Sequence, residues 1–269
     1  MTALCSGKIC TIFPEKGALN FWKACTIALE YSVKLQKQIT VFEIRLKVFL
    51  LKDIPLSKML TAEAYFIDSV LTKDQEWLTY HETNQYKLYC LNGLFPLERD
   101  GIYKKEQIYT ITIRTVEAEL ARYFAKELSN HSSNQMKGLI AERRIVPRKM
   151  ISEIYTLTPV IQKWEQGYWK VQASVEEYER RLFENAIKKY KQFTGNEEID
   201  EEFQLYTGIT FLNRKPVPVE YKGIRLLGDK LNLKIADNEQ AQELAYFLTG
   251  VGIGEINSRG MGFCNYRWL

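Results

Sequence analysis

The sequence Gly250-Val251-Gly252-Ile253-Gly254-Glu255-Ile256-Asn257-Ser258-Arg259-Gly260-Met261-Gly262-Phe263 lies close to the end of this 269-residue chain. It contains two Gly-x-Gly pairs with five residues between them, Gly252/Gly254 and Gly260/Gly262. Glycine adopts positive φ freely and lets backbone N–H groups approach a ligand closely. Together with the polar residues Asn257, Ser258 and Arg259, this concentration of glycine predicts a loop that binds an anionic group.

The position of this glycine-rich stretch argues against a dinucleotide site. A dinucleotide fingerprint follows the first strand of a domain and opens a helix. Here the stretch follows a predicted helix, Asn238 to Leu248, and leads into a last short strand, Phe263 to Leu269.

The spacing resembles the glycine-rich signature of the repeat-associated (RAMP) superfamily of CRISPR-associated proteins. It is most similar to that of the endoribonucleases that cut CRISPR repeat RNA into guides. The pattern G-apolar-G, five residues, G-apolar-G-apolar fits Gly252 to Phe263 without a gap. The resemblance implies an α+β fold of two tandem ferredoxin-like (βαββαβ) units. The structural alternative is a turn that ties a helix to an edge strand.

The order of predicted elements agrees with that fold. Strand, helix, strand, strand, helix and strand are expected, in that order, over 39–51, 55–71, 85–94, 107–116, 117–128 and 139–157. A second such series follows: a short strand over 168–172, a helix over 175–193, a hairpin of 210–219 with 224–235, and then the helix, glycine-rich stretch and strand named above. We therefore expect domains at 39–160 and 161–269. Residues 1–38 are expected to be an N-terminal extension of unclear role, with helical periodicity over 18–38.

Charge and cysteine content narrow the classes of function. The net charge is only +4, but basic residues gather in two segments, 137–149 and 214–234. Separation of charge along the chain is typical of a local phosphate-binding surface. We expect RNA contacts from six of these residues in addition to the glycine-rich stretch: Arg143, Arg144, Arg148, Lys149, Arg214 and Lys215.

The five cysteines have scattered spacing and form no Cys-x-x-Cys pair, and neither histidine lies at metal-ligand spacing from a cysteine. This favours a cytoplasmic protein with reduced thiols, no bound metal and no cofactor. No apolar stretch is long enough to span a membrane, and we see no signal peptide.

Metal-independent RNA cleavage needs a base for the 2′-hydroxyl, an acid for the leaving 5′-oxygen and a cation beside the phosphorane. Histidine suits proton transfer near neutral pH, and the chain has two, His81 and His131. The resemblance implies a catalytic histidine in the loop after the first helix, with a tyrosine on that helix and a lysine on the next strand. Here these are His81, Tyr65 and Lys87.

Helical periodicity supports Tyr65, because it falls opposite the apolar face made by Leu60, Ala64, Ile67 and Leu71. His131 lies in a polar segment after the second helix and is the alternative histidine.

The resemblance implies cleavage of CRISPR repeat RNA (pre-crRNA) that leaves a 2′,3′-cyclic phosphate and a 5′-hydroxyl, by a monomer or homodimer. It leaves room for other CRISPR effector subunits as partners. Two rivals remain open. One is a catalytically inactive RNA-binding RAMP subunit of an effector complex, which would not need His81. The other is a RAMP-like interaction protein without RNA, favoured if the basic segments prove dispersed.

Overall fold

Strand β3 (Phe42–Leu50) shows how the sequence builds the first sheet. Ile44, Leu46, Val48 and Leu50 are fully buried, whereas the alternate residues Arg45 and Lys47 are exposed. Alternation with a period of two places the apolar side chains on one face of a sheet. That face receives the helices of the first unit.

The structure is a computed structural model and describes residues 3–5, 8–10 and 38–269. Strands β1 (Ala3–Cys5) and β2 (Lys8–Cys10) pair antiparallel within a unit of residues 1–38. The helix expected over 18–38 lies outside the described residues except for its last position. Residues 39–269 form the other compact unit, which carries both sheets considered below. In the part of the chain that the structure describes, no helix is long and apolar enough to cross a membrane.

The first half of residues 39–269 is a ferredoxin-like fold with one additional helix. After β3 come α2 (Leu56–Leu71), α3 (Gln75–Glu82), β5 (Tyr89–Phe95), β7 (Ile108–Thr115), α4 (Ala118–Glu127) and β8 (Met136–Ile145). The sheet order is β5-β7-β3-β8, and all neighbours are antiparallel. The short strands β4 (Ile54–Pro55) and β6 (Ile102–Tyr103) pair beside it.

The second half repeats the same topology. Its strands and helices are β9 (Ile151–Thr156), α5 (Val175–Thr194), β10 (Tyr206–Phe211), β13 (Leu231–Ile235), α6 (Glu239–Val251) and β14 (Cys264–Trp268). Across each sheet the strands follow one another as the second, third, first and fourth of that sheet in chain order. The order β10-β13-β9-β14 therefore corresponds to β5-β7-β3-β8. The prediction of an α+β chain with two tandem ferredoxin-like folds is confirmed.

Four local predictions were wrong. The single strand expected over 139–157 is two strands, β8 and β9, and they belong to different sheets. Residues 168–172 contain the 3₁₀ helix η1 (Trp169–Val171) rather than a strand. The hairpin pairs β10 with β13, and a further hairpin, β11 (Val217–Tyr221) with β12 (Ile224–Gly228), is inserted between them. Helix α3 was expected to be a loop. Since β9 already pairs in the second sheet, we propose a domain division between Ile145 and Ile151 instead of at residue 160.

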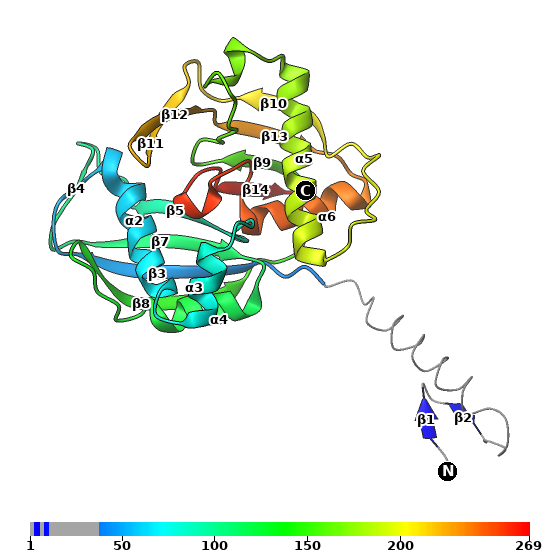
Figure 1. The fold of residues 1–269 in the computed structure, drawn as a ribbon, viewed down its shortest axis with the longest axis horizontal. Coiled ribbons are helices and arrows are strands. Elements are labelled where there is room, and N and C mark those ends of the chain that lie inside the picture. The colour runs from blue at the N-terminus through cyan, green and yellow to red at the C-terminus, as the bar shows by residue number, and fades with distance from the viewer. Residues whose placement is uncertain (1–2, 6–7, 11–37) are drawn as a thin grey trace. The chain divides into compact units, whose positions relative to one another are not determined.

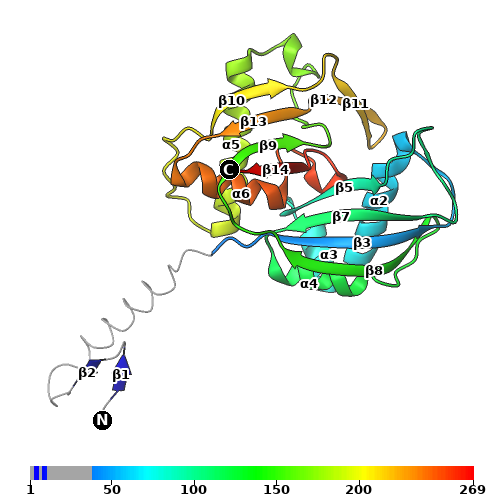
Figure 2. The ribbon, with the colours of Figure 1, turned by 180° about the vertical axis from the view of Figure 1, so that it is seen from behind.

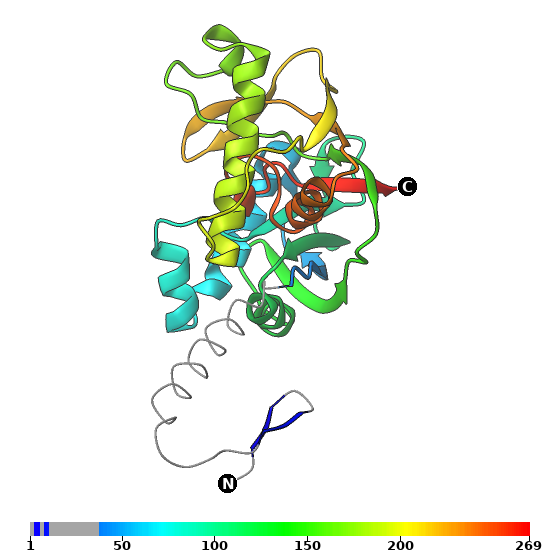
Figure 3. The same cartoon turned by 90° about the vertical axis from the view of Figure 1, so that its right-hand side faces the viewer.

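The helices of both halves cover the same side of the molecule. Figure 1 shows α2–α6 in front of the sheets, and Figure 2, from behind, shows the strands in front. Figure 3 shows the long helix α5 on the side away from the C-terminal strand β14. The faces of the sheets without helices are therefore on the opposite side of the molecule from α5.

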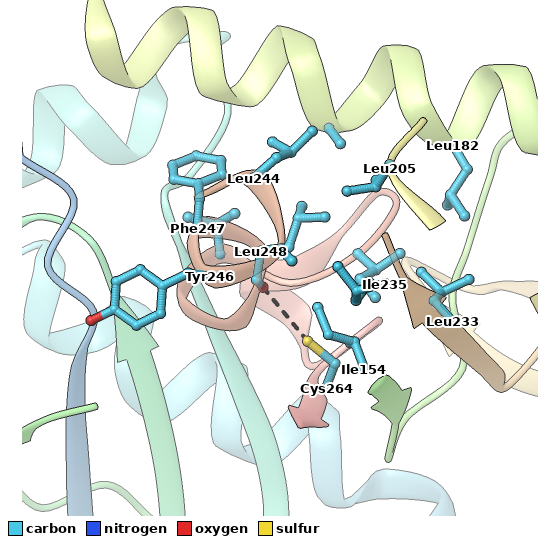
Figure 4. Close-up of a cluster of buried hydrophobic side chains, with 14 of the residues drawn as sticks. Ile154, Leu182, Leu205, Leu233, Ile235, Leu244, Tyr246, Phe247, Leu248 and Cys264 are labelled. Carbon is cyan, nitrogen blue, oxygen red and sulfur yellow. Dashed lines mark hydrogen bonds between the residues drawn. The ribbon is translucent and has the colours of Figure 1, made fainter. Parts of the chain in front are cut away.

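Helix α6 joins the two halves. Its residues Leu244, Phe247 and Leu248 pack into the second core, and the Cys264 thiol donates to the Leu248 carbonyl oxygen at 3.6 Å (Figure 4). On its other side, the Tyr246 hydroxyl donates to the Val146 carbonyl oxygen at 2.7 Å and accepts from the Val41 N–H at 3.2 Å. Helix α6 thus holds the first half at two points, just before β3 at Val41 and just after β8 at Val146.

Candidate functional site

The glycine-rich stretch forms a buried loop between α6 and β14. Gly252, Gly254, Gly260 and Gly262 are buried and have positive φ. At Gly262, with φ of 61°, a Cβ would lie 1.9 Å from the Ile253 carbonyl oxygen. At Gly260, with φ of 85°, it would lie 2.6 Å from a Leu60 methyl on α2. The packing of the loop against its own protein therefore requires these glycines, without any ligand.

Asn257 closes the loop from inside. Its side-chain N–H groups donate to the carbonyl oxygens of Ile253 and Met261, both at 2.9 Å, and the residue is only 5% exposed. Its amide oxygen also accepts a hydrogen bond from Lys189 at 2.6 Å. The expectation that Asn257 contacts RNA is corrected, because its polar atoms are buried and used within the protein.

Lys189, from α5, fixes the loop in place. Its buried ammonium donates to the Gly252 carbonyl oxygen at 3.0 Å and to the Gly254 carbonyl oxygen, in addition to Asn257. Burial lowers the pKa of Lys189 to about 7, since a charged group loses the favourable energy of hydration there. Lys189 was not among the predicted site residues.

The exposed edge of the loop meets the first half of the chain. The 3₁₀ helix η2 (Asn257–Arg259) lies beside α2 and β5, and the loop is drawn in red next to α2 in Figure 1. The Arg259 guanidinium forms an ion pair with Oδ2 of Asp68 on α2. The other Asp68 oxygen, Oδ1, lies 3.6 Å from Nδ1 of His81. Asp68 thus brings together the predicted residues His81 and Arg259, although Asp68 itself was not among the predicted site residues.

His81 lies in the last turn of α3 rather than in a loop. The helix begins at Asp74, whose side chain accepts from the N–H groups of Glu76 and Trp77 at 2.9 and 3.3 Å. An N-cap of this kind stabilises a helix by about 1 kcal/mol. Positive charge on a protonated His81 would interact favourably with the helix C-terminus.

Lys87 is held at the same end of α3. Its ammonium donates to the carbonyl oxygens of Thr83, at 2.6 Å, and Tyr80. Burial lowers the pKa of Lys87, and the positive charge of Arg259 lowers it further. Of its three N–H donors, two are used in these bonds. The ammonium lies within electrostatic reach of Arg259.

Tyr65 lies on α2, three residues before Asp68. Residues three apart on a helix are neighbours on its surface, roughly 5–6 Å apart at Cβ. The side chain is 59% exposed, in agreement with the periodicity that placed it opposite the apolar face. Its role in catalysis stays a prediction.

His131, the alternative histidine, follows α4 and contacts α2 at Ser69 and Phe66. Its Nε2 is 2.7 Å from the Ser69 hydroxyl, and its ring packs against Phe66 at a centroid distance of 4.9 Å. Burial lowers the pKa of His131, and so does Lys73 nearby. Its contacts account for its position without a role at the His81 cluster.

A polar cavity of about 290 Å³, open on one side, lies against the sheet faces without helices. Glu43, 1% exposed, accepts hydrogen bonds there from Arg114 at 2.8 Å, Arg144 at 2.9 Å and Arg45 at 3.0 Å. Burial would raise the pKa of Glu43, but the arginines, Arg114 foremost, outweigh burial and lower it. Three arginines around one carboxylate leave an excess of positive charge. Tyr155 and Asn265 line the cavity from the second sheet.

The other predicted basic residues do not join this cavity. Arg143, next to Arg144 on β8, lies over the Phe42 ring at 5.9 Å, and Arg148 pairs with Glu243 at 3.0 Å. Lys149 is exposed between β8 and β9, and Arg214 and Lys215 are exposed after β10. Among residues 3–5, 8–10 and 38–269, no group of three or more His, Cys, Asp and Glu side chains is placed to hold a metal ion.

Residues 133–266, which carry β8 and nearly all of the second half with its loop, match the family "CRISPR associated protein Cas6, C-terminal". This part of the chain is therefore similar to the Cas6 C-terminal family. The chain is 27% identical over 218 residues to the CRISPR-associated endoribonuclease Cas6 2 of Methanocaldococcus jannaschii, covering 74% of this chain and 88% of that protein.

Solved structures agree on the Cas6-like fold. One, described as a RAMP protein binding different RNA substrates, has a TM-score of 0.64 and 17% identity, covering 84% of this chain and 99% of its own. Another, of a CRISPR associated protein Cas6, has a TM-score of 0.60 and 19% identity, covering 84% and 99%. At these identities the two structures establish the fold alone.

The geometry of the loop predicts that a side chain at Gly262 lowers the stability of the fold. Gly262→Ala should lower the free energy of unfolding by about 2 kcal/mol or more, because a Cβ there combines positive φ with a clash against backbone. The matched control is Gly208→Ala, where a Cβ meets nothing within 4 Å. It should change stability by less than about 0.5 kcal/mol. Urea denaturation of both variants measures this, and equal stability of the two would contradict the packing role.

The buried ammonium predicts a pH dependence of stability. With a folded pKa of about 7 and an ordinary unfolded pKa, Lys189 binds fewer protons folded than unfolded above pH 7. Stability therefore rises with pH through this group, by up to about 1.4 kcal/mol per unit. The free energy of unfolding of the natural chain minus that of Lys189→Met should thus grow between pH 7 and 9. Lys188→Met, at the exposed neighbouring position, is the control and should show a flat difference.

Proposed function

We propose that this chain is an endoribonuclease that cleaves CRISPR repeat RNA to produce guide RNA. The observation that carries the proposal is the convergence of His81 and Lys87, at the end of α3, with Arg259 of the glycine-rich loop. These side chains come from both halves of the chain. The proposal is further supported by the similarity to the Methanocaldococcus jannaschii protein, whose name describes a CRISPR-associated endoribonuclease.

The proposed reaction is attack of a 2′-hydroxyl on the adjacent phosphorus, with breakage of the bond from phosphorus to the 5′-oxygen. The products are a 2′,3′-cyclic phosphate and a 5′-hydroxyl. His81 and Tyr65 divide the two proton transfers: one removes the proton of the 2′-hydroxyl, and the other protonates the leaving 5′-oxygen. Lys87 stabilises the charge that develops on the phosphorane.

The arrangement of Lys87 suits that role. Two of its donors are tied to backbone carbonyl oxygens at the end of α3, so the ammonium is held in place before RNA binds. A preorganised cation costs no reorganisation during the reaction. The third donor is the one proposed to contact a phosphate oxygen.

We also propose that the arginine-lined cavity between the sheets contacts the RNA backbone. Arg45 and Arg144 are about half exposed there, with side-chain exposures of 49% and 51%. They are anchored by Glu43 and hence fixed in orientation. Guanidinium groups bind phosphate through paired N–H donors.

Removal of the imidazole tests the catalytic assignment. His81→Ala should slow single-turnover cleavage of repeat RNA by roughly 10²–10⁴-fold, the range of a general acid or base. RNA affinity should change little. His131→Gln is the matched control and should cut at the natural rate, and the reverse pattern would move the site to His131. Binding without cleavage by the unaltered chain would favour the inactive RNA-binding subunit.

Cleavage should proceed in EDTA, because imidazole, phenol and ammonium groups supply the acid, base and cation that the reaction needs. A 2′-deoxy nucleotide 5′ to the cut phosphate should abolish it, since the nucleophile is then missing. The measurement is gel analysis of labelled repeat RNA with and without EDTA. Activity lost in EDTA and restored by magnesium, or undiminished cleavage of the deoxy substrate, would count against this mechanism.

A further inference from the structure

Asp68 holds two partners that belong to different halves of the chain. Oδ2 pairs with the Arg259 guanidinium, whereas Oδ1 is buried and has no hydrogen-bond partner. The polar atom that faces Oδ1 is Nδ1 of His81, at 3.6 Å. A buried carboxylate oxygen without a hydrogen bond is destabilising, because its lost hydration is not replaced, so its position needs an explanation.

We propose that Asp68 is a positioning residue that orients the His81 imidazole for RNA cleavage, with its charge balanced by Arg259 of the glycine-rich loop. The proposal rests on the proposed function for its effect on cleavage. Its effect on the imidazole itself can be measured without RNA.

The geometry determines which ring nitrogen is available. When Nδ1 carries a proton and points at Oδ1, it can donate to the carboxylate, and Nε2 is then the nitrogen left for proton transfer with RNA. The separation of 3.6 Å is slightly longer than a hydrogen bond. Hydrogen bonds of catalytic groups are often long without substrate and shorten when substrate binds. The partner of an imidazole fixes its tautomer and stabilises the imidazolium form.

Arg259 has the opposite electrostatic effect. Asp68 on α2 faces His81, Arg259 on the loop pairs with Asp68, and Lys87 is bonded to the carbonyl oxygens of Tyr80 and Thr83 on either side of His81 in the sequence. Tyr89 on β5 lies near Asp68 and Arg259, but burial raises its pKa far enough to keep it neutral. Loss of the Asp68 charge removes the carboxylate that faces the imidazole and leaves the Arg259 charge unbalanced. Loss of the Arg259 charge leaves the Asp68 carboxylate without its other partner.

These contacts predict that loss of the Asp68 charge and loss of the Arg259 charge shift the titration midpoint of the His81 ring in opposite directions. A purely structural ion pair between the two halves would not produce such shifts. Asp68→Asn should move the titration midpoint of the His81 ring to lower pH, by roughly 0.5–1 unit. Arg259→Gln should move it to higher pH by a similar amount. His131, in contact with Ser69 and Phe66, serves as an internal control and should move by less than about 0.2 unit.

The experiment is an NMR titration of the histidine rings in the full chain. The sequence has only two histidines, so a His81→Gln spectrum assigns both signals. Thermal melts of each variant establish that it is folded. An Asp68→Asn midpoint that stays within 0.2 unit of the natural chain, or movement of both variants in one direction, would overturn the proposal. If Asp68→Asn does not fold, the Arg259→Gln shift decides it.

Cleavage provides the second measurement. Asp68→Asn should slow single-turnover cleavage about tenfold or more at unchanged RNA affinity, and Asp68→Glu should restore part of the rate. An Asp68→Asn rate equal to that of the natural chain would overturn the positioning role. If the natural chain does not cut RNA, the proposed function fails, while the titration still decides whether Asp68 governs the His81 ring.

Discussion

The geometry of the site depends on one buried ammonium group. The glycines of the loop turn the Gly252 and Gly254 carbonyl oxygens toward the interior, where each needs a donor. Lys189 supplies that donor and also contacts the Asn257 amide, which ties the two sides of the loop together. Because all three acceptors are uncharged, the lysine is held by hydrogen bonds rather than by an ion pair. These hydrogen bonds fix the backbone of the loop, and with it the position of Arg259 at the exposed edge of the loop.

The same chain of contacts explains why a site assembled from two halves can be rigid. Helix α6 leads directly into the loop, and its Tyr246 is bonded to both Val41 and Val146 of the first half. On the side of the cavity, the buried Arg114 donates to Glu43 and to the Cys264 carbonyl oxygen at 2.7 Å. A buried ion pair stabilises a fold little, but removal of one partner costs about 3–5 kcal/mol. These bonds therefore fix the relative placement of the sheets more than they add stability.

The sequence predicted elements with a clear period and failed where packing decides. Strand β3 and helix α2 were found because their buried residues repeat every two or about 3.6 positions. Helix α3 has no buried residue and is only eight residues long, so it has no apolar stripe to reveal it. The division of β8 from β9 depends on which sheet offers a partner, and no local pattern encodes that choice. Residues 168–172 contain two aromatic residues and were taken for a strand, yet the Trp169 ring packs against Tyr178 and its N–H donates to Asp229.

The site was predictable to the extent that it follows from a motif. His81 and Arg259 were expected in the site and both lie beside the Asp68 carboxylate, and Lys87 lies within electrostatic reach of Arg259. Asn257 was expected to face RNA but points inward, as a polar residue in a glycine-rich loop can equally do. The sequence does contain a sign that Lys189 is unusual. It falls on the buried stripe of α5 between Ala186 and Phe193, where an apolar residue is expected. A lysine at such a position needs buried acceptors, and a loop of glycines with inward carbonyl groups provides them.

The burial of the four glycines changes what their motif signifies. A loop that cradles phosphate would leave its glycines open to the ligand, but here their neighbours are Ile253, Asn257, Leu60 and residues 160–161. The motif therefore specifies how the end of α6 packs against α2 and β5, which is a property of the fold. Fold and chemistry are separable, and chemistry resides in particular side chains. The side chains proposed for the chemistry lie on α2, on α3 and, for Lys87, after α3, and the glycine-rich loop holds Arg259 against Asp68.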